Sequence, residues 1–205
     1  MNLKYLPIKQ AIRLPICISY RVRIICKGSI KIKAGKIRLA MIRIGFHQVP
    51  VCDGSDQTLL IIEKGGVLIF CGDAHIGNGS KLHVAPSASL KLGDNFAISA
   101  SSAINCYKKI TFGRDIQFSW NCLVMDSDTH QILDINGKCI NEDRPIRFGD
   151  KIWVGCNTTV LKGADIPSNC VIGANSVVCG RVFEENSIII GNPAKCSKKI
   201  GCWQL

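Results

Sequence analysis

Aliphatic or aromatic residues recur every six positions along the C-terminal part of the chain. The series comprises Phe148, Val154, Val160, Ile166, Ile172 and Val178, and it resumes at Ile190 after a break. A period of six matches neither the 3.6-residue repeat of an α-helix nor the two-residue alternation of a simple strand. It is typical of a flat wall made of one short strand and one turn, and three walls close a triangular coil of about 18 residues. The pattern therefore predicts an all-β fold, a parallel β-helix of stacked coils.

The same period extends upstream with small offsets. Phe112, Phe118 and Val124 are in phase with Phe148. A preceding run is offset by two residues and comprises Leu92, Ile98, Ile104 and Ile110. The offset predicts a short insertion near residues 107–109. Asn and Gly stand where corners are expected, as in residues 78–79, and both tolerate positive φ.

Three regions follow from this pattern. Residues 66–192 are expected to form the β-helix, interrupted by a long loop over residues 126–147. Residues 1–65 show a strand-like alternation of apolar and polar residues with an imperfect six-residue repeat, which indicates irregular early coils or an N-terminal cap. Residues 193–205 form a short tail that closes the other end. Both ends of a solenoid need covering, because exposed strand edges can pair with other chains.

The composition is consistent with a cytoplasmic β-solenoid. Hydrophobic residues make up 47% and aromatic residues 6%, which suits thin layers filled by aliphatic side chains. The twelve cysteines contain no CxxC pair and are expected to be free thiols in a reducing compartment. No cluster of Cys and His ligands indicates zinc, so no metal is expected. Residues 1–20 predict neither export nor a transmembrane anchor.

The positive charge is concentrated at the N-terminal end. The net charge is +11, and residues 1–52 contain eleven Lys or Arg and no acidic residue. Such a segment favours an anionic partner, although a solvated basic face explains the same pattern. Our hypothesis is that it contacts a membrane surface carrying lipid-linked saccharides, or an anionic glycan. The protein would then be peripheral at the inner face of the membrane, and nucleic acid is not an expected partner.

The long loop holds the residues best suited to chemistry. It opens with two carboxylates and one imidazole, at Asp126, Asp128 and His130. A histidine whose Nδ1 is held by an acidic group or a carbonyl can present Nε2 as a base near neutral pH. Such a base could deprotonate a hydroxyl for attack on a thioester. A solvated or structural histidine is the alternative interpretation of the same cluster.

Taken together, several segments of the chain resemble one enzyme family, the left-handed β-helix hexapeptide acyltransferases. The resemblance is to the branch of maltose/galactoside and colanic-acid-type polysaccharide O-acetyltransferases, and it covers about residues 67–200. The segments that carry it are VMDSDTHQI, RPIRFGDKIWVGCNTTVLKGADI, VIGANSVVCG and IIGNPAK. The resemblance implies a left-handed β-helix, acetyl-CoA as co-substrate, a saccharide acceptor, and homotrimers with sites between subunits.

On the acceptor side the resemblance implies that His130 is the general base. Asp128 or Asp126 would orient it or line the acceptor pocket, and a further acidic residue would fall at Glu142, where the spacing differs by one. The family's acceptor-facing asparagine is replaced here by residues 100–102, which read Ala-Ser-Ser. The acceptor and part of the oxyanion stabilisation therefore depart from the family pattern.

On the donor side the resemblance implies a wall along the pantetheine arm and a tail at the nucleotide phosphates. The wall comprises Trp153, Gly155, Cys156, Gly173 and Ala174. The tail comprises Asn192, Pro193, Ala194, Lys195 and Lys198. The family's Thr-Lys pair is replaced by Cys179 and Gly180, so Arg181 is expected to contact the 3′-phosphate. The alternative for Lys195 and Lys198 is a solubilising tail.

Other activities of solenoid proteins fit less well. A γ-type carbonic anhydrase needs three zinc-binding histidines, and the four histidines of this chain (His47, His75, His83 and His130) lack the expected close pair. A non-catalytic binding scaffold would need neither the loop nor the tail. N-acetyltransfer to an amino sugar or a xenobiotic stays open, whereas serine acetyltransferases carry a large helical N-terminal domain that has no counterpart here. The sequence names neither the acceptor nor the acyl chain.

Overall fold

In the computed structural model, which describes residues 1–46, 49–50, 52, 55–180 and 183–204, the chain winds into a prism of three flat sheets. Sheet 1 contains β1 (Ile16–Ile18), β4 (Ile42–Phe46), β7 (Ala74–Gly77), β10 (Phe96–Ala100), β13 (Ile116–Trp120), β16 (Ile152–Val154), β19 (Cys170–Ile172), β21 (Ser187–Gly191) and β22 (Ala194–Lys199). Sheet 2 contains β2 (Val22–Cys26), β5 (Thr58–Ile62), β8 (Lys81–Val84), β11 (Ala103–Cys106), β14 (Leu123–Met125), β17 (Thr159–Leu161) and β20 (Val177–Val178). Sheet 3 contains β3 (Ser29–Ile32), β6 (Val67–Phe70), β9 (Ser89–Leu92), β12 (Lys109–Thr111), β15 (Ile146–Phe148) and β18 (Asp165–Ile166).

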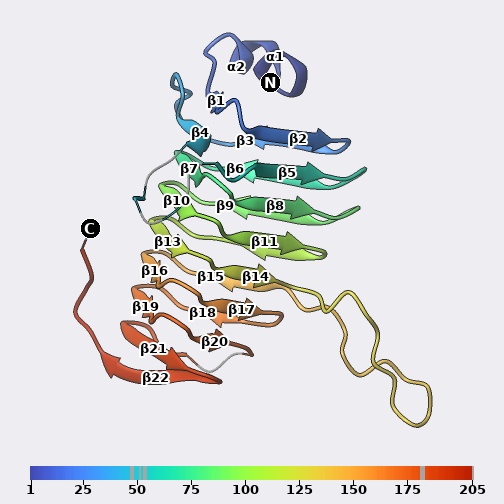
Figure 1. Cartoon of the computed structure of the whole chain (residues 1–205), viewed down its shortest axis with the longest axis vertical. Coiled ribbons are helices and arrows are strands. Elements are labelled where there is room, and N and C mark those ends of the chain that lie inside the picture. The colour runs from blue at the N-terminus through green and yellow to red at the C-terminus, as the bar shows by residue number, and fades with distance from the viewer. Residues whose placement is uncertain (47–48, 51, 53–54, 181–182, 205) are drawn as a thin grey trace.

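Successive strands along the chain pass from sheet to sheet, so hydrogen bonds join one coil to the next (Figure 1). All strand pairs within the coils are parallel, as the six-residue period predicts. Ile152 pairs with Cys170 and Val160 pairs with Val178, which gives coils of 18 residues in the C-terminal part. Strands β1 to β5 belong to the same sheets, so the described residues between Ile16 and Ile62 also contribute to coils.

The two-residue offset upstream is explained by one corner between sheets 2 and 3. From Val160 to Ile166 the inward positions are six residues apart, whereas from Ile104 to Phe112 they are eight apart. The additional residues lie in the turn at 107–108, next to the insertion expected at 107–109. At the end of the series the expectation was wrong by one residue. Ile189 pairs with Ile172 and is buried, whereas Ile190 is exposed.

Corners between walls are made by residues with positive φ. Asn95, Asn121, Asn157, Asn169 and Asn175 all have φ between 55° and 59°, a conformation that asparagine tolerates better than most residues. Tight stacking of coils requires glycine at one corner, because a Cβ on Gly93 would lie 1.8 Å from the carbonyl oxygen of Gly113. The Asn and Gly positions therefore set the spacing of the coils.

The interior is filled by aliphatic side chains and, near the long loop, by four packed phenylalanine rings. Phe96, Phe112, Phe118 and Phe148 are buried, with ring centroids between 4.6 and 6.0 Å apart. Rings at this separation in tilted or edge-on geometry attract one another beyond their burial. The coils that carry the loop therefore rest on a well-packed core.

The ends of the solenoid are closed differently. At the N-terminal end, α1 (Asn2–Tyr5) and α2 (Ile8–Ala11) cover the first coil. The buried side chain of Asn2 donates to the Ile16 carbonyl oxygen and accepts from the Ile16 N–H, both at 2.9 Å. At the other end β22 runs antiparallel to β21. No helix in the described ranges is long and apolar enough to cross a bilayer.

Candidate active site

The long loop leaves the prism where sheet 2 meets sheet 3. It joins the end of β14 to the start of β15, over residues 126–145, and projects away from the body of the molecule (Figure 1). Ile110 of the preceding coil pairs with Ile146, so the strands on both sides of the loop remain in register. The loop is therefore an excursion from an unbroken prism, and its base is held by two sheets.

Asp126 anchors the start of the loop. Its fully buried carboxylate accepts hydrogen bonds from the backbone N–H groups of Tyr107, Lys108 and Lys109, at 2.6, 2.9 and 2.6 Å. Three converging N–H groups form a site for an anion. The family resemblance implies that Asp126 orients His130 or lines the acceptor pocket. In the structure its carboxylate instead holds the corner turn of the preceding coil.

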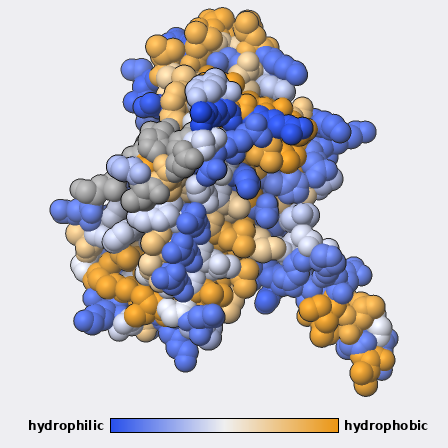
Figure 2. Space-filling view, in the orientation of Figure 1, coloured by the Kyte–Doolittle hydropathy of each residue, from blue (hydrophilic) through white to orange (hydrophobic). Residues whose placement is uncertain are grey.

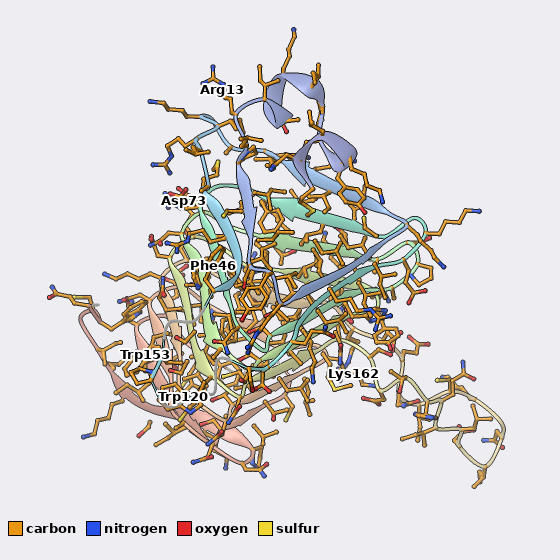
Figure 3. All side chains as sticks on the ribbon, turned by 45° about the horizontal axis from the view of Figure 1, so that its top comes forward. Arg13, Phe46, Asp73, Trp120, Trp153 and Lys162 are labelled. Atoms are coloured by element: carbon orange, nitrogen blue, oxygen red, sulfur yellow. The ribbon has the colours of Figure 1, made fainter. Side chains whose placement is uncertain are left out.

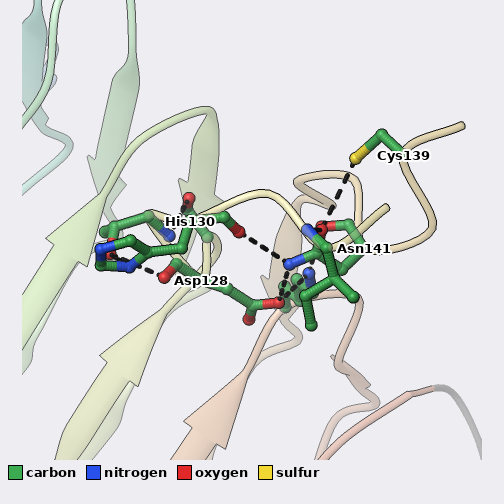
Figure 4. Close-up of polar contacts among 8 residues, drawn as sticks. Asp128, His130, Cys139 and Asn141 are labelled. Atoms are coloured by element: carbon green, nitrogen blue, oxygen red, sulfur yellow. Dashed lines mark hydrogen bonds and ion pairs between the residues drawn. The ribbon is translucent and has the colours of Figure 1, made fainter. Parts of the chain in front are cut away.

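Asn141 ties the two arms of the loop together (Figure 4). Its amide nitrogen donates to the Asp128 carboxylate and to the His130 carbonyl oxygen, both at 2.8 Å, and its oxygen accepts from the Ile132 N–H at 2.6 Å. The Lys162 ammonium, from the turn after β17, donates to the Asp128 carboxylate and to the Asn141 carbonyl oxygen. The Lys162 side chain is 12% exposed, so this ammonium is largely enclosed by the loop.

The partners of Asp128 also set its charge state. The hydrogen bond from Lys162, followed by that from Asn141, lowers the pKa of the Asp128 carboxyl below its ordinary value. Asp128 is therefore a carboxylate at neutral pH, and it serves to fix the loop rather than to hold the imidazole of His130.

The ring of His130 is held by Thr129 instead of by a carboxylate. Thr129 Oγ1 lies 3.1 Å from His130 Nδ1 and donates to the Asp128 carbonyl oxygen at 2.6 Å. A carbonyl oxygen can only accept, so the single hydroxyl hydrogen of Thr129 is already used. The arrangement favours Nδ1–H donating to Thr129, which leaves Nε2 unprotonated.

His130 borders an open hollow of about 530 Å³ at the base of the loop. Residues around it include Tyr107, Ser127, Thr129, Asn141 and Glu142. Glu142 is exposed and lines this hollow together with His130. The hollow is open to solvent on one side and polar, which suits a hydroxyl-rich molecule.

The donor-side candidates lie elsewhere on the prism. Trp153 is in β16 of sheet 1, is 44% exposed, and donates from Nε1 to Ser119 Oγ at 3.3 Å. Figure 3 shows Trp153 beside Trp120 on one side of the molecule and Lys162 near the loop on another. Among the described residues, no hydrogen bond or ion pair joins Trp153 to His130 or to the residues that hold the His130 segment.

Close packing of coils accounts for the donor-side glycines. A Cβ on Gly155 would lie 2.6 Å from the backbone nitrogen of Ala174, and a Cβ on Gly173 would lie 2.6 Å from Ile190 Cγ2. Gly155, Gly173 and Ala174 therefore meet at one corner of the prism, and Cys156 follows at the same corner. Glycine is required there by the neighbouring coil, whether or not a ligand approaches.

The tail brings two lysines to the edge of sheet 1. Asn192 and Pro193 form the turn between β21 and β22, and Ala194 starts β22. Lys195 pairs with Ile190 and Lys198 pairs with Ile188, and both lysines are exposed. Arg181, expected at the 3′-phosphate, lies outside the described residues.

Three residues of this site were not predicted from the sequence, namely Thr129, Asn141 and Lys162. Their residue types are common in loops and turns, and their roles depend on a loop conformation that the six-residue period does not encode. The described residues contain no group of three or more His, Cys, Asp or Glu side chains able to hold a metal ion.

The known proteins that this chain is similar to are acetyltransferases. No protein-family model matches the sequence. "Probable acetyltransferase Rv3034c" of Mycobacterium tuberculosis is 32% identical over 127 residues, 60% of this chain and 41% of that protein. "Putative lipopolysaccharide biosynthesis O-acetyl transferase WbbJ" of Escherichia coli is 30% identical over 147 residues, 67% of this chain and 74% of that protein. The chain thus spans less than half of the first relative and about three quarters of the second.

Among solved structures, the polySia-specific acetyltransferase NeuO has a TM-score of 0.66 and 20% sequence identity. The match covers 91% of this chain and 90% of NeuO. At this identity the likeness concerns the fold, and it confirms the left-handed parallel β-helix expected from the sequence.

Proposed function

Because this chain belongs to the hexapeptide-repeat acetyltransferases, we propose that it transfers an acetyl group from acetyl-CoA to a hydroxyl of a saccharide, with His130 as the general base. The observation that carries the proposal is the tether of the His130 segment. Asn141, Thr129 and Lys162 hold this segment at the edge of a polar hollow. A histidine serving only as solvated surface would need no such support.

The proposed reaction uses the unprotonated Nε2 of His130. Nε2 accepts the proton of the acceptor hydroxyl while the hydroxyl oxygen forms a bond to the thioester carbonyl carbon. The carbon–sulfur bond then breaks, and His130 returns the proton to the departing sulfur. The products are an O-acetyl ester and the free thiol of coenzyme A. The Thr129 oxygen, which accepts from Nδ1–H, stabilises the imidazolium that forms between these steps.

The donor side of the proposal rests on exposed groups of suitable chemistry. The open face of Trp153 can pack against the pantetheine arm, and the ammonium groups of Lys195 and Lys198 can pair with phosphates. The other donor-side candidates are near these groups. The corner after β16 and β19 carries Cys156, Gly173 and Ala174, and the edge of sheet 1 carries the turn at Asn192 and Pro193. Arg181 stays a candidate for the 3′-phosphate.

Assembly would bring the two halves of the site together. His130 projects from the corner of sheets 2 and 3, whereas Trp153 is on sheet 1, so we propose a homotrimer in which each site uses two subunits. Exposed apolar residues at the loop tip support this arrangement, namely Ile132, Leu133, Ile135 and Ile140. Sedimentation velocity tests it, and a monomer at micromolar concentration would contradict it.

The decisive test is acetyl-CoA turnover against a panel of saccharides, amino sugars and glycolipids. His130→Ala should lower kcat by about 10²–10⁴-fold, the usual range for a general base. Asn136→Ala, an exposed loop residue outside this hollow, is the control and should retain activity. Calorimetric binding of coenzyme A should be equal in all three proteins. Full activity of His130→Ala would show that another group is the base, and absent coenzyme A binding would favour a scaffold.

A further inference from the structure

The N-terminal end of the prism exposes a cluster of large apolar side chains. The helices α1 and α2 turn Asn2, Leu6 and Ala11 inward, where all three are buried. They leave outward Leu3, Ile8 and Ile12, which are 74%, 65% and 67% exposed. Figure 2 shows this end of the molecule as an apolar crown flanked by hydrophilic surface.

A second segment extends the same crown. The loop between β3 and β4 lies beside the end of α2, where the Ala40 N–H donates to the Leu14 carbonyl oxygen at 3.1 Å. Leu14 and Leu39 are 51% and 73% exposed. We call Leu3, Ile8, Ile12, Leu14 and Leu39 together the apolar tip. Five such residues exposed at one end of a molecule mark an interaction surface.

The charges that residues 1–52 themselves place around the apolar tip are all positive. Lys4, Lys9, Arg13 and Lys36 are exposed between or beside its members. Arg38, which precedes Leu39, is already paired with Asp73. No acidic residue occurs within residues 1–52, so the remaining four basic side chains have no acidic neighbour in their own segment.

We propose that the apolar tip docks on a membrane surface rich in anionic phospholipid. Leucine and isoleucine side chains raised on an end cap can enter the boundary between headgroups and acyl chains, while lysine and arginine meet lipid phosphates. A second copy docked tip to tip would bring two like-charged rims together, which is unfavourable. The combination of apolar crown and basic rim therefore matches an anionic bilayer.

Docking through the apolar tip also sets the distance between the His130 loop and the membrane surface. Four coil-to-coil steps separate β2 from β14 in sheet 2, and each step is about 4.8 Å, so the base of the His130 loop lies roughly 20 Å along the prism from the first coil, which α1 and α2 cover. If the proposed function holds, the acceptor would then be a saccharide displayed from the same surface. Docking itself requires no acetyl transfer, so the two proposals can fail separately.

The test is sedimentation of the full chain with two kinds of vesicle. One kind contains phosphatidylcholine alone, and in the other about one lipid in three is the anionic phosphatidylglycerol. We expect binding to the anionic vesicles that weakens with salt. The triple variants Leu3→Ser/Ile8→Ser/Ile12→Ser and Lys4→Gln/Lys9→Gln/Arg13→Gln should each lose at least tenfold in vesicle affinity. Lys64→Gln/Lys81→Gln/Lys91→Gln removes the same charge from exposed positions elsewhere and should bind as the unaltered chain does.

Three results would overturn the proposal. The first is no binding of the unaltered chain to anionic vesicles. The second is equal loss in the control variant, which would show that net charge alone is responsible. The third is a change in oligomeric state, measured without lipid, in the serine variant, which would assign the tip to contacts between copies. Circular dichroism of each variant establishes whether it is folded. If the serine triple variant is not folded, the single variant Leu3→Ser is measured in its place.

Discussion

The side-chain amide of Asn141 donates a hydrogen bond of 2.8 Å to the main-chain oxygen of His130. Its second N–H reaches the carboxylate of Asp128, which also accepts from Lys162. One amide and one ammonium therefore fix the backbone on both sides of the proposed base, although neither touches the imidazole. Their expected effect is on the placement of Nε2.

Asn141→Ala should lower kcat by about 10²-fold, because a displacement of about 1 Å in a reacting group costs that much. The KM for acetyl-CoA should stay unchanged, since the donor-side candidates lie on sheet 1. Lys162→Met should act in the same direction, and Lys162→Arg, which keeps the charge and can still donate to Asp128, should recover most of the activity. Equal activity of Met and Arg variants would show that Lys162 only fills space.

Asp126→Ala should destabilise the protein by about 1–3 kcal/mol in urea unfolding, because three part-buried hydrogen bonds from backbone N–H groups would lose their buried acceptor. Asp126→Asn, which keeps one accepting oxygen, should lose less. Asp56→Ala, at an exposed position before β5, is the control and should change the free energy of unfolding by less than about 0.5 kcal/mol. An Asp126→Ala variant as stable as this control would contradict the anchoring role.

His75 should make stability depend on pH below neutrality. Burial, followed by the positive charge of Arg43, lowers the pKa of His75 to about 4, whereas the unfolded value is about 6.5. Between these values the unfolded chain binds a proton that the folded chain does not, so the free energy of unfolding falls as pH is lowered. The loss between pH 6.5 and 5 should be about 1–2 kcal/mol.

Denaturant titrations at pH 6.5 and 5 measure this loss. His75→Gln, which stays neutral throughout, should show a smaller difference between the two conditions. His130→Gln, which changes an exposed histidine, should behave as the unaltered chain. The idea fails if all three proteins lose stability equally.

Thiol reactivity should separate the cysteines into two groups. Burial raises the pKa of Cys106 to about 12, with the Asp126 charge acting in the same direction, and burial raises the pKa of Cys122 to about 11. Alkylation requires the thiolate, so these two thiols should stay unmodified by iodoacetamide at pH 8 while exposed Cys196 reacts. Peptide mass spectrometry measures the order, and early modification of Cys106 would contradict it.

Lys195→Gln combined with Lys198→Gln should weaken coenzyme A binding by about tenfold, equivalent to ~1.4 kcal/mol. Lys199→Gln removes one charge from the same strand, against two in the double variant, and Lys199 is already paired with Glu184, so its effect should be less than half as large. Calorimetry at two salt concentrations measures both. Equal effects of the two changes would favour a solubilising tail.

The β-helix could be predicted because its repeat is enforced at every coil. Each inward position, such as Val160, must be apolar, and each tight corner, such as Asn157 with φ 57°, favours a residue tolerant of positive φ. His130 could be predicted because a motif places it after in-phase β14. The support by Thr129 and Asn141 could not, because it arises between residues whose separation in an irregular loop follows no period. The hydrogen-bond partners of Asp126 could not be predicted either, since residues 107–109 belong to another coil.

The pair of hydrogen bonds between Asn2 and Ile16 has a consequence for how long the solenoid can grow. A parallel coil is open-ended in principle, because its last strand offers the same donors and acceptors as the one before, and stacked copies could extend it into a fibre. Asn2 occupies the N–H and carbonyl of Ile16 with a side chain that offers no strand beyond it, and β22 reverses direction at the opposite edge. One amide at the first coil and one hairpin at the last therefore hinder the addition of a further parallel strand to sheet 1.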